Sequence, residues 1–152
     1  MYRARYKVHF DMAHHHSRDD EFHGHGFTAE VFVASRCLDS ECRALNEDVT
    51  DAVAAIAIIW HQRCAMSSGK SMDLGMGPQN AVIFPGIPTA DVLAKTMFDR
   101  IKKVIEELKP SNKMILEKVR VHEGDMYWAE YSDLKYPHDG KTAETPRHPA
   151  TV

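Results

Sequence analysis

The sequence predicts an α+β domain in which two helices cover one face of a four-stranded antiparallel sheet. Three observations lead to this prediction: alternating apolar runs near both ends of the chain, two segments of helical spacing between them, and a length of 152 residues. With 43% hydrophobic and 27% charged residues, the chain can bury a core without disulfides or a structural metal. We assign residues 1–136 to this single domain.

Two alternating segments predict the first pair of strands. From Tyr2 to Phe10 every second residue is apolar or aromatic, and the residues between them are basic. The run from Phe27 to Ala34 alternates in the same way, apart from Phe32 on its polar side. Because segments that follow one another in sequence commonly pair, we expect antiparallel neighbours joined by a histidine-rich connection.

Two segments with apolar residues at helical spacing predict the helices. The first runs from about Asn46, its expected N-cap, to Cys64. The second carries an apolar stripe that ends at Leu108, before Pro110, and Thr89 is expected to cap its first turn. Between the helices, residues 66–86 are rich in glycine, proline, serine and methionine and predict a long loop.

The C-terminal part of the domain predicts a β-hairpin. Its strands are Ile115–Glu123 and Met126–Tyr131, joined by Gly124-Asp125 as a two-residue turn. The polar, proline-bearing tail at 137–152 is expected to lack fixed structure. Four strands leave two unpaired sheet edges, so we expect the chain to form a homo-oligomer.

Composition excludes several classes of partner. The net charge is −3, and no run of lysine and arginine is interleaved with aromatics, so we expect no nucleic-acid partner. The longest apolar stretch, 52–60, is far shorter than the roughly 18 residues that span a bilayer, and the N-terminus has no hydrophobic signal core. The chain has an odd number of cysteines, without Cys-x-x-Cys spacing: Cys37, Cys42 and Cys64. This pattern indicates neither a disulfide framework nor a thiolate zinc site, and it favours a location in the reducing cytoplasm.

Six of the ten histidines lie between His9 and His25. His23 and His25 share one face of the second strand, and His14 falls on the buried side of the first strand if that strand continues so far. The two strand ends meet at one loop, so the three imidazoles can converge. Without an evident fourth protein ligand they match a catalytic zinc site, whose open position takes water or substrate.

The alternative interpretation of the cluster is a solvated histidine-rich loop that binds metal without specificity. His15 and His16 are expected at the surface in either case. His9 and His122 alternate to the outer faces of their strands, and we expect them to make ordinary polar contacts.

Four segments and one tyrosine, in order along residues 2–131, form a recognisable set: Phe10-Asp11-Met12-Ala13-His14, His23-Gly24-His25, Pro88-Thr89-Ala90-Asp91-Val92-Leu93-Ala94, Val119-Arg120-Val121-His122-Glu123, and Tyr131. Together they resemble the signatures of the 6-pyruvoyltetrahydropterin synthase family, which includes the 6-carboxytetrahydropterin synthases of queuosine biosynthesis. The resemblance implies a tunnelling fold, in which trimers close their sheets into a barrel and stack into hexamers. Active sites would then lie between subunits.

The resemblance also implies roles for individual residues. Zn²⁺ would be the cofactor, held by His14, His23 and His25, and the substrate would be a reduced pterin such as 7,8-dihydroneopterin triphosphate. Glu123 would anchor the guanidine-like edge of the pterin, because a carboxylate accepts two parallel N–H bonds from such an edge. Thr89 would lie near the same pocket, unless its role is only that of a helix cap.

The sequence departs from the family at the groups that move protons. The family's usual base is a cysteine four residues before the His-x-His pair, and that position is Asp19 here. Asp19 or Glu21 could replace it if burial raised the carboxyl pKa, although the acidic run could also be a solvated turn. For the family's catalytic Asp-His pair, His61 keeps only the histidine and Asp73 only the aspartate.

Three functional hypotheses follow from these losses. The first is a zinc-dependent pterin lyase with an altered base. The second is an aldolase-like variant that releases a 6-hydroxymethyl pterin, an activity attributed to family members with an acidic residue in place of the cysteine. The third is a protein that binds zinc and a pterin without turnover.

Overall fold

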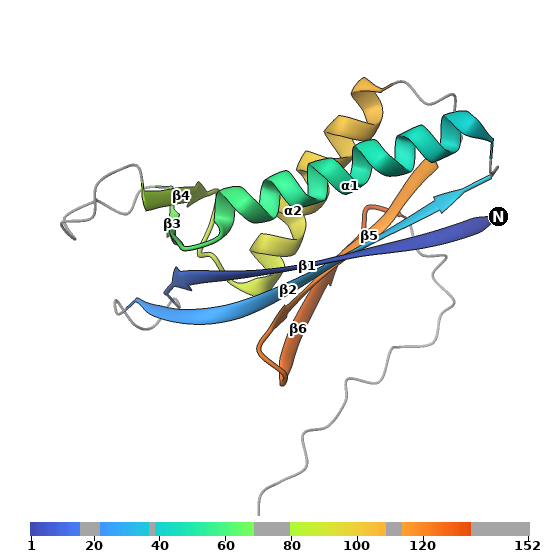
Figure 1. The fold of residues 1–152 in the computed structure, drawn as a ribbon. Coiled ribbons are helices and arrows are strands. Elements are labelled where there is room, and N and C mark those ends of the chain that lie inside the picture. The colour runs from blue at the N-terminus through green and yellow to red at the C-terminus, as the bar shows by residue number, and fades with distance from the viewer. Residues whose placement is uncertain (16–21, 37–38, 69–79, 109–113, 135–152) are drawn as a thin grey trace, which may run out of the picture.

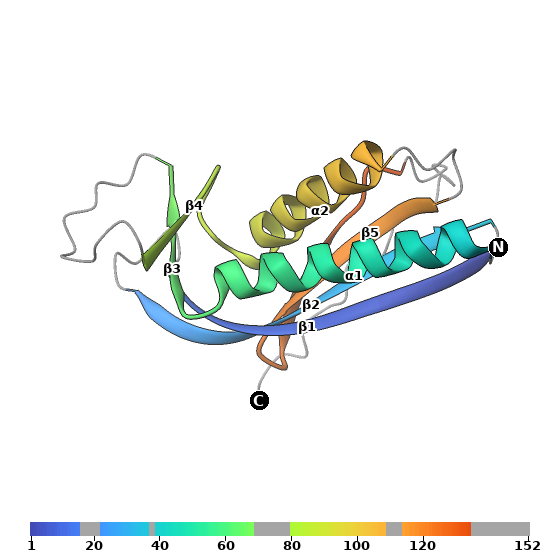
Figure 2. The same ribbon diagram turned by 45° about the horizontal axis from the view of Figure 1, so that its top comes forward.

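The computed structural model describes residues 1–15, 22–36, 39–68, 80–108 and 114–134. Along the chain the elements are β1 (Tyr2–His14), β2 (His23–Ser35), α1 (Ser40–Trp60), β3 (Arg63–Ser67), β4 (Ala81–Phe84), α2 (Ala90–Glu107), β5 (Met114–Glu123) and β6 (Tyr127–Tyr131). Both helices lie on one face of a curled sheet, as Figures 1 and 2 show from two directions. The predicted α+β class is therefore confirmed. The predicted tail at 137–152 lies outside the described residues.

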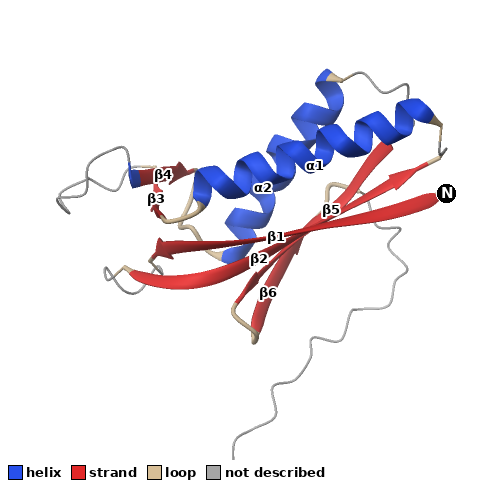
Figure 3. Cartoon of the chain, viewed as in Figure 1, coloured by secondary structure: helices blue, strands red, loops and turns tan. Residues whose placement is uncertain are grey.

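The sheet differs from the four antiparallel strands that the sequence predicts. Its described part has six strands in the order β4-β3-β1-β2-β5-β6. β1, β2, β5 and β6 are antiparallel neighbours, whereas β3 runs parallel to β1 and β4 runs parallel to β3. The two extra strands (Figure 3) lie at the ends of the predicted loop, and in neither of them do buried and exposed residues alternate, so the periodic signal of a half-buried strand is absent. Residues 69–79 of that loop lie outside the described part of the chain.

The first helix begins and ends earlier than its apolar spacing predicts. Its N-cap is Asp39 rather than Asn46, and the Asp39 carboxylate accepts a 2.9 Å hydrogen bond from the backbone N–H of Cys42. The helix stops at Trp60 because the backbone of His61 is extended, and Gln62 then adopts a positive φ of 56° and donates its backbone N–H to the carbonyl of Asp11. The chain then enters β3.

The core between the helices and the sheet is centred on aromatic rings. Phe10 of β1 stacks on Phe27 of β2, with ring centroids 5.6 Å apart, and meets the edge of Trp60 from α1 at 5.5 Å. All three rings are buried. The prediction that Phe10 and Phe27 lie on the buried face of the first two strands is therefore confirmed. Within the described residues, neither helix is long and apolar enough to cross a membrane.

The predicted hairpin is confirmed, although its turn is longer than predicted. Glu123 is paired with Tyr127, so residues 124–126 form the turn. Gly124 takes a φ of 61°, a left-handed conformation that glycine adopts without steric cost. Its backbone N–H donates to the carbonyl of Gly26, and the end of β5 is thereby held against β2.

The sheet face that points away from the helices carries a charged network around Glu30. Its carboxylate lies 3.1 Å from Arg5 of β1 and 3.0 Å from the imidazole of His122 on β5. On the same face His9 hydrogen-bonds Thr28 at 2.8 Å. His9 and His122 therefore make the polar contacts that the alternation of their strands predicts.

We expect the Glu30 network to make folding stability fall in acid. Burial raises the pKa of the Glu30 carboxyl, but the hydrogen bond from His122 and the charges of Arg5, His122 and Arg120 outweigh it and hold the pKa below its ordinary value. A lowered pKa stabilises the folded state above the ordinary carboxyl pKa, and this contribution disappears as the pH falls through the folded-state value.

The free energy of unfolding in urea should therefore drop more steeply for the wild type than for Glu30→Gln between about pH 6 and about pH 3. Glu117→Gln is a suitable control, because it removes an ion pair to the largely exposed Arg3. Equal acid sensitivity of the wild type and Glu30→Gln would contradict this prediction.

Candidate functional site

Three histidines converge where β1 and β2 end. β1 continues to His14, which is paired directly with His23, and His25 follows two residues later on the same face of β2. The ring centroids of His14 and His23 are 4.7 Å apart, those of His23 and His25 4.8 Å, and those of His14 and His25 5.2 Å. The structure thus brings together the three imidazoles singled out in the sequence.

The carboxylate of Glu123 joins these histidines from β5. Its Oε1 lies 3.3 Å from Nε2 of His14 and 3.5 Å from Nε2 of His25. One ligand atom from each of the four side chains lies within 4.8 Å of the others, and this group could hold a metal ion. The sequence showed no fourth protein ligand, because the position of Glu123 depends on the pairing of β5 with β2.

His14 is the most tightly held member of the group. Its side chain is 0% exposed, and its Nδ1 lies 2.8 Å from the carbonyl oxygen of Pro88, just before α2. A carbonyl only accepts hydrogen bonds, so Nδ1 carries the proton in this contact. In the neutral ring, Nε2 then presents its lone pair to the cluster, and a second partner of this kind orients many metal-binding histidines.

The donor set fits zinc. Imidazole nitrogens and a carboxylate oxygen are ligands that Zn²⁺ accepts, and it binds most often four of them. His14, His23, His25 and Glu123 supply three nitrogens and one oxygen from rigid strand ends. These residues would therefore hold the ion without any contribution from the described cysteines.

A cavity of about 430 Å³ adjoins the histidine cluster and shares His25 and Glu123 with it. Thr89, Asp91 and Tyr127 complete its lining. The volume lies in the range of about 300 to 1,000 Å³ that is usual for small-molecule sites. Both residues that the sequence assigns to substrate binding, Glu123 and Thr89, thus face one cavity beside the metal-binding group.

Thr89 stands at the N-cap position of α2 but makes no capping bond with its side chain. Its hydroxyl instead donates to Oδ1 of Asp91 at 2.6 Å. The expectation that Thr89 caps the helix donors through its hydroxyl is therefore wrong. The hydrogen bond fixes a second carboxylate, besides that of Glu123, at the edge of the cavity.

Of the remaining predicted catalytic residues, only His61 lies in the described part of the chain, and it is not at the cluster. His61 follows α1, is 44% exposed, and its Nδ1 accepts a hydrogen bond from the backbone N–H of Asp11. It does not belong to the metal-binding group. Asp19, Glu21 and Asp73 lie outside the described residues.

One prediction within the histidine cluster is wrong. His15 was expected at the surface but is buried, with its ring edge-to-face against Phe22 at 5.1 Å. The spacing of the histidines does not indicate that Phe22, at the other end of the connection, packs against His15. His16 lies outside the described residues.

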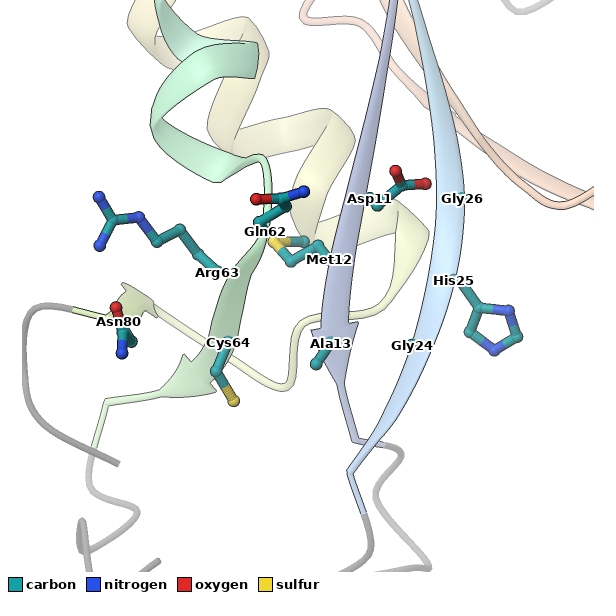
Figure 4. Close-up of a pocket in the computed structure, with 10 residues that line it drawn as sticks. All are labelled: Asp11, Met12, Ala13, Gly24, His25, Gly26, Gln62, Arg63, Cys64 and Asn80. Atoms are coloured by element: carbon teal, nitrogen blue, oxygen red, sulfur yellow. The ribbon is translucent and has the colours of Figure 1, made fainter. Parts of the chain in front are cut away.

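The described cysteines do not replace the missing catalytic thiol. Cys42 and Cys64 are free and buried, and burial raises the pKa of the Cys64 thiol, which disfavours the thiolate. Cys64 lines a second open cavity of about 550 Å³, whose lining also includes His25, and β1 lies between the strands that carry these two residues (Figure 4). Cys37 lies outside the described residues.

Comparison with known proteins gives one family and several related structures. Residues 4–133 match the family described as 6-pyruvoyl tetrahydropterin synthase. No curated protein matches the chain. An uncharacterized protein from Wolinella succinogenes is 14% identical with a TM-score of 0.61, and the match covers 87% of this chain and 98% of that chain.

Two Plasmodium structures are also similar. A Plasmodium vivax 6-pyruvoyltetrahydropterin synthase, described as a catalytic-residue mutant with cysteine in place of glutamate, is 12% identical, with a TM-score of 0.61 and coverage of 86% and 98%. Plasmodium falciparum 6-pyruvoyl tetrahydropterin synthase is 13% identical, with a TM-score of 0.56 and coverage of 85% and 96%. At these identities the likeness establishes a shared fold.

Proposed function

Because the chain belongs to the 6-pyruvoyl tetrahydropterin synthase family, we propose that it is a zinc-dependent lyase acting on a reduced pterin such as 7,8-dihydroneopterin triphosphate. Family membership supports a pterin-related lyase, and the zinc dependence and the substrate are the proposal. One observation carries it: the His14, His23 and His25 group borders a cavity that also contains the carboxylate of Glu123.

The lining of this cavity suits a flat ring with several N–H donors. Glu123 would accept two parallel hydrogen bonds from the guanidine-like edge of a pterin, and such charge-assisted pairs orient a ligand as well as bind it. Asp91, held by the hydroxyl of Thr89, offers a second acceptor. Tyr127 lines the same cavity and supplies aromatic surface.

Proton transfer would fall to carboxylates of this chain. Bound zinc would lower the cost of the negative charge that develops when a carbon-bound proton leaves the substrate. Asp19, at the family's cysteine position, or Glu21 would accept that proton, a contribution of about 10²- to 10⁴-fold. Pro88 would keep His14 in the tautomer that faces the site.

We further propose that the chain forms a homo-oligomer, a hexamer built as a dimer of trimers. The edge strands β4 and β6 support this proposal, because both present exposed large side chains, including Ile83 and Trp128. In such an assembly the exposed imidazole of His61 would serve the site of a neighbouring subunit.

A second candidate function has its own support. The similar Plasmodium vivax enzyme is described with a glutamate as a catalytic residue, and this chain carries Asp19 at the family's cysteine position and Glu21 two residues further on. An aldolase-like reaction that cleaves a carbon–carbon bond of the side chain and releases 6-hydroxymethyl-dihydropterin is therefore the alternative. Zinc and pterin binding without turnover is the third.

A product assay separates these functions. We expect zinc-loaded protein incubated with 7,8-dihydroneopterin triphosphate to give a 6-pyruvoyl or 6-carboxy pterin, identified by mass spectrometry. A 6-hydroxymethyl product would select the aldolase reaction, and tight binding without product would select the third function. Protein that bound neither zinc nor the pterin would overturn all three.

The same assay identifies the base. Whichever of Asp19→Asn and Glu21→Gln removes the base should slow product formation by about 10²- to 10⁴-fold and leave zinc content unchanged. The other variant serves as its control. Full activity in both variants would exclude Asp19 and Glu21 as the base.

A further inference from the structure

The position of the Glu123 carboxylate has a simple geometric meaning. Zinc bonds of about 2.0 to 2.1 Å in a tetrahedron place neighbouring ligand atoms about 3.3 to 3.4 Å apart. Oε1 of Glu123 lies 3.3 Å from Nε2 of His14 and 3.5 Å from Nε2 of His25. Both contacts of Glu123 thus have the spacing of neighbouring ligands of one tetrahedral ion, and the ligand atoms of the whole group lie within 4.8 Å of one another.

A direct ion pair between the same groups would have a different geometry. Charge-assisted hydrogen bonds from nitrogen to a carboxylate are about 2.7 to 2.9 Å long, shorter than either distance from Glu123. The hydrogen bond from Nδ1 of His14 to Pro88 also fixes the ring so that Nε2 faces the carboxylate oxygen. Nε2 of His14 and Oε1 of Glu123 are therefore placed where both can bind one cation.

We propose that Glu123 is the fourth ligand of the zinc in the resting protein and closes the site. This proposal rests on the zinc dependence in the proposed function. The sequence predicts an open fourth position on the zinc, whereas here that position is filled until the Glu123 carboxylate moves away from the metal. The backbone of the turn stays fixed, because Gly124 is bonded to Gly26 across the sheet. Only the side chain has to rotate toward the cavity.

This arrangement makes the metal and a pterin compete for one carboxylate. Glu123 lies in the metal-binding group and also lines the cavity, and its side chain is only 10% exposed. When its oxygens accept the N–H groups of a ring in the cavity, they no longer bind the metal. Binding of the ring would thus open the fourth metal position, which otherwise excludes water and small anions.

The test uses metal-free protein reloaded with zinc or with cobalt(II), whose visible absorption reports coordination number. The wild type should show the intense bands of four-coordinate cobalt, and added azide should change them only weakly. Glu123→Gln should bind zinc at least about 10- to 100-fold more weakly, and azide should change its cobalt spectrum readily. Asp91→Asn, which alters the same cavity but not the metal-binding group, should keep wild-type zinc affinity.

The outcomes distinguish this proposal from the proposed function. Wild-type zinc affinity and an unchanged cobalt spectrum in Glu123→Gln would overturn the fourth ligand and leave the zinc dependence intact. Wild-type protein that bound neither metal would overturn the zinc dependence itself. If Glu123→Gln does not fold, the azide titration of the wild type decides, because ready binding would mean an open site.

Discussion

Replacing His14 with alanine is expected to abolish metal binding and to destabilise the fold at the same time. The imidazole is completely buried, its ring meets Phe27 edge-to-face at 5.2 Å, and it donates a hydrogen bond to Pro88. The substitution leaves a cavity and removes the donor of a buried carbonyl, so the metal-free protein should lose about 2 to 4 kcal/mol. Zinc affinity should fall by more than about 100-fold, beyond the loss typical of an outer-shell partner.

Two other histidines provide matched comparisons for His14→Ala. His23→Ala removes a partly exposed member of the same group, so zinc affinity should fall strongly with a smaller loss of stability. His9→Ala lies on the opposite face, bonded to Thr28, and should keep wild-type zinc content. Metal content and urea unfolding of the metal-free proteins measure both effects. Zinc retained by His14→Ala, or lost equally from His9→Ala, would contradict the assignment.

The histidine cluster was predictable because a strand repeats every two residues. Phe10 marks the buried side of β1, and the same parity leads to His14. An antiparallel pairing of consecutive segments then sets His14 opposite His23 without any knowledge of the rest of the sheet. Local periodicity and a short connection were sufficient for this part of the site.

The rest of the site depends on contacts between distant segments. Glu123 reaches the histidines only because β5 pairs with β2, with Phe27 opposite Glu123. Pro88 orients His14 across a similar separation in sequence. Neither contact has a periodic signal. β3 was not predicted for the same reason: it pairs with a segment distant in sequence, and its pairing with β1 covers only Met12–Ala13 and residues 63–64.

One error could have been avoided from the sequence. The apolar stripe of α1 continues backwards from Val49 through Leu45 to Cys42, at the spacing of a helix, and Asp39 is a suitable N-cap in front of it. The N-cap was predicted at Asn46 because the acidic residues Glu47 and Asp48 follow it. Asn46 instead accepts a hydrogen bond from the hydroxyl of Tyr6 on β1.

Trp60 links the core to both structures that hold His14. Its buried ring packs edge-to-face against Phe10, which lies on β1 upstream of His14, and against Phe84, which lies on β4 upstream of Pro88. The Trp60 side chain thus supports both His14 and the Pro88 carbonyl that orients it. A loss of packing at Trp60 should reach the metal site through both strands.

Trp60→Ala should therefore reduce both stability and zinc affinity. Removal of a fully buried tryptophan costs about 3 to 5 kcal/mol. Looser contact between His14 and Pro88 should weaken zinc binding by about 10-fold or more, since outer-shell partners contribute on this scale. Urea unfolding of the metal-free protein and zinc competition with a chelator measure the two effects.

Trp60→Phe is the matched control for this prediction. The indole N–H is buried and has no hydrogen-bond partner among the described residues, so phenylalanine removes no hydrogen bond. Because phenylalanine keeps an aromatic ring between Phe10 and Phe84, it should cost less than half as much stability and leave zinc affinity near that of the wild type. Unchanged zinc affinity in Trp60→Ala would show that the strand ends hold His14 without this packing. Equal losses in the two variants would show instead that the full area of the indole, rather than any aromatic ring at this position, supports the site.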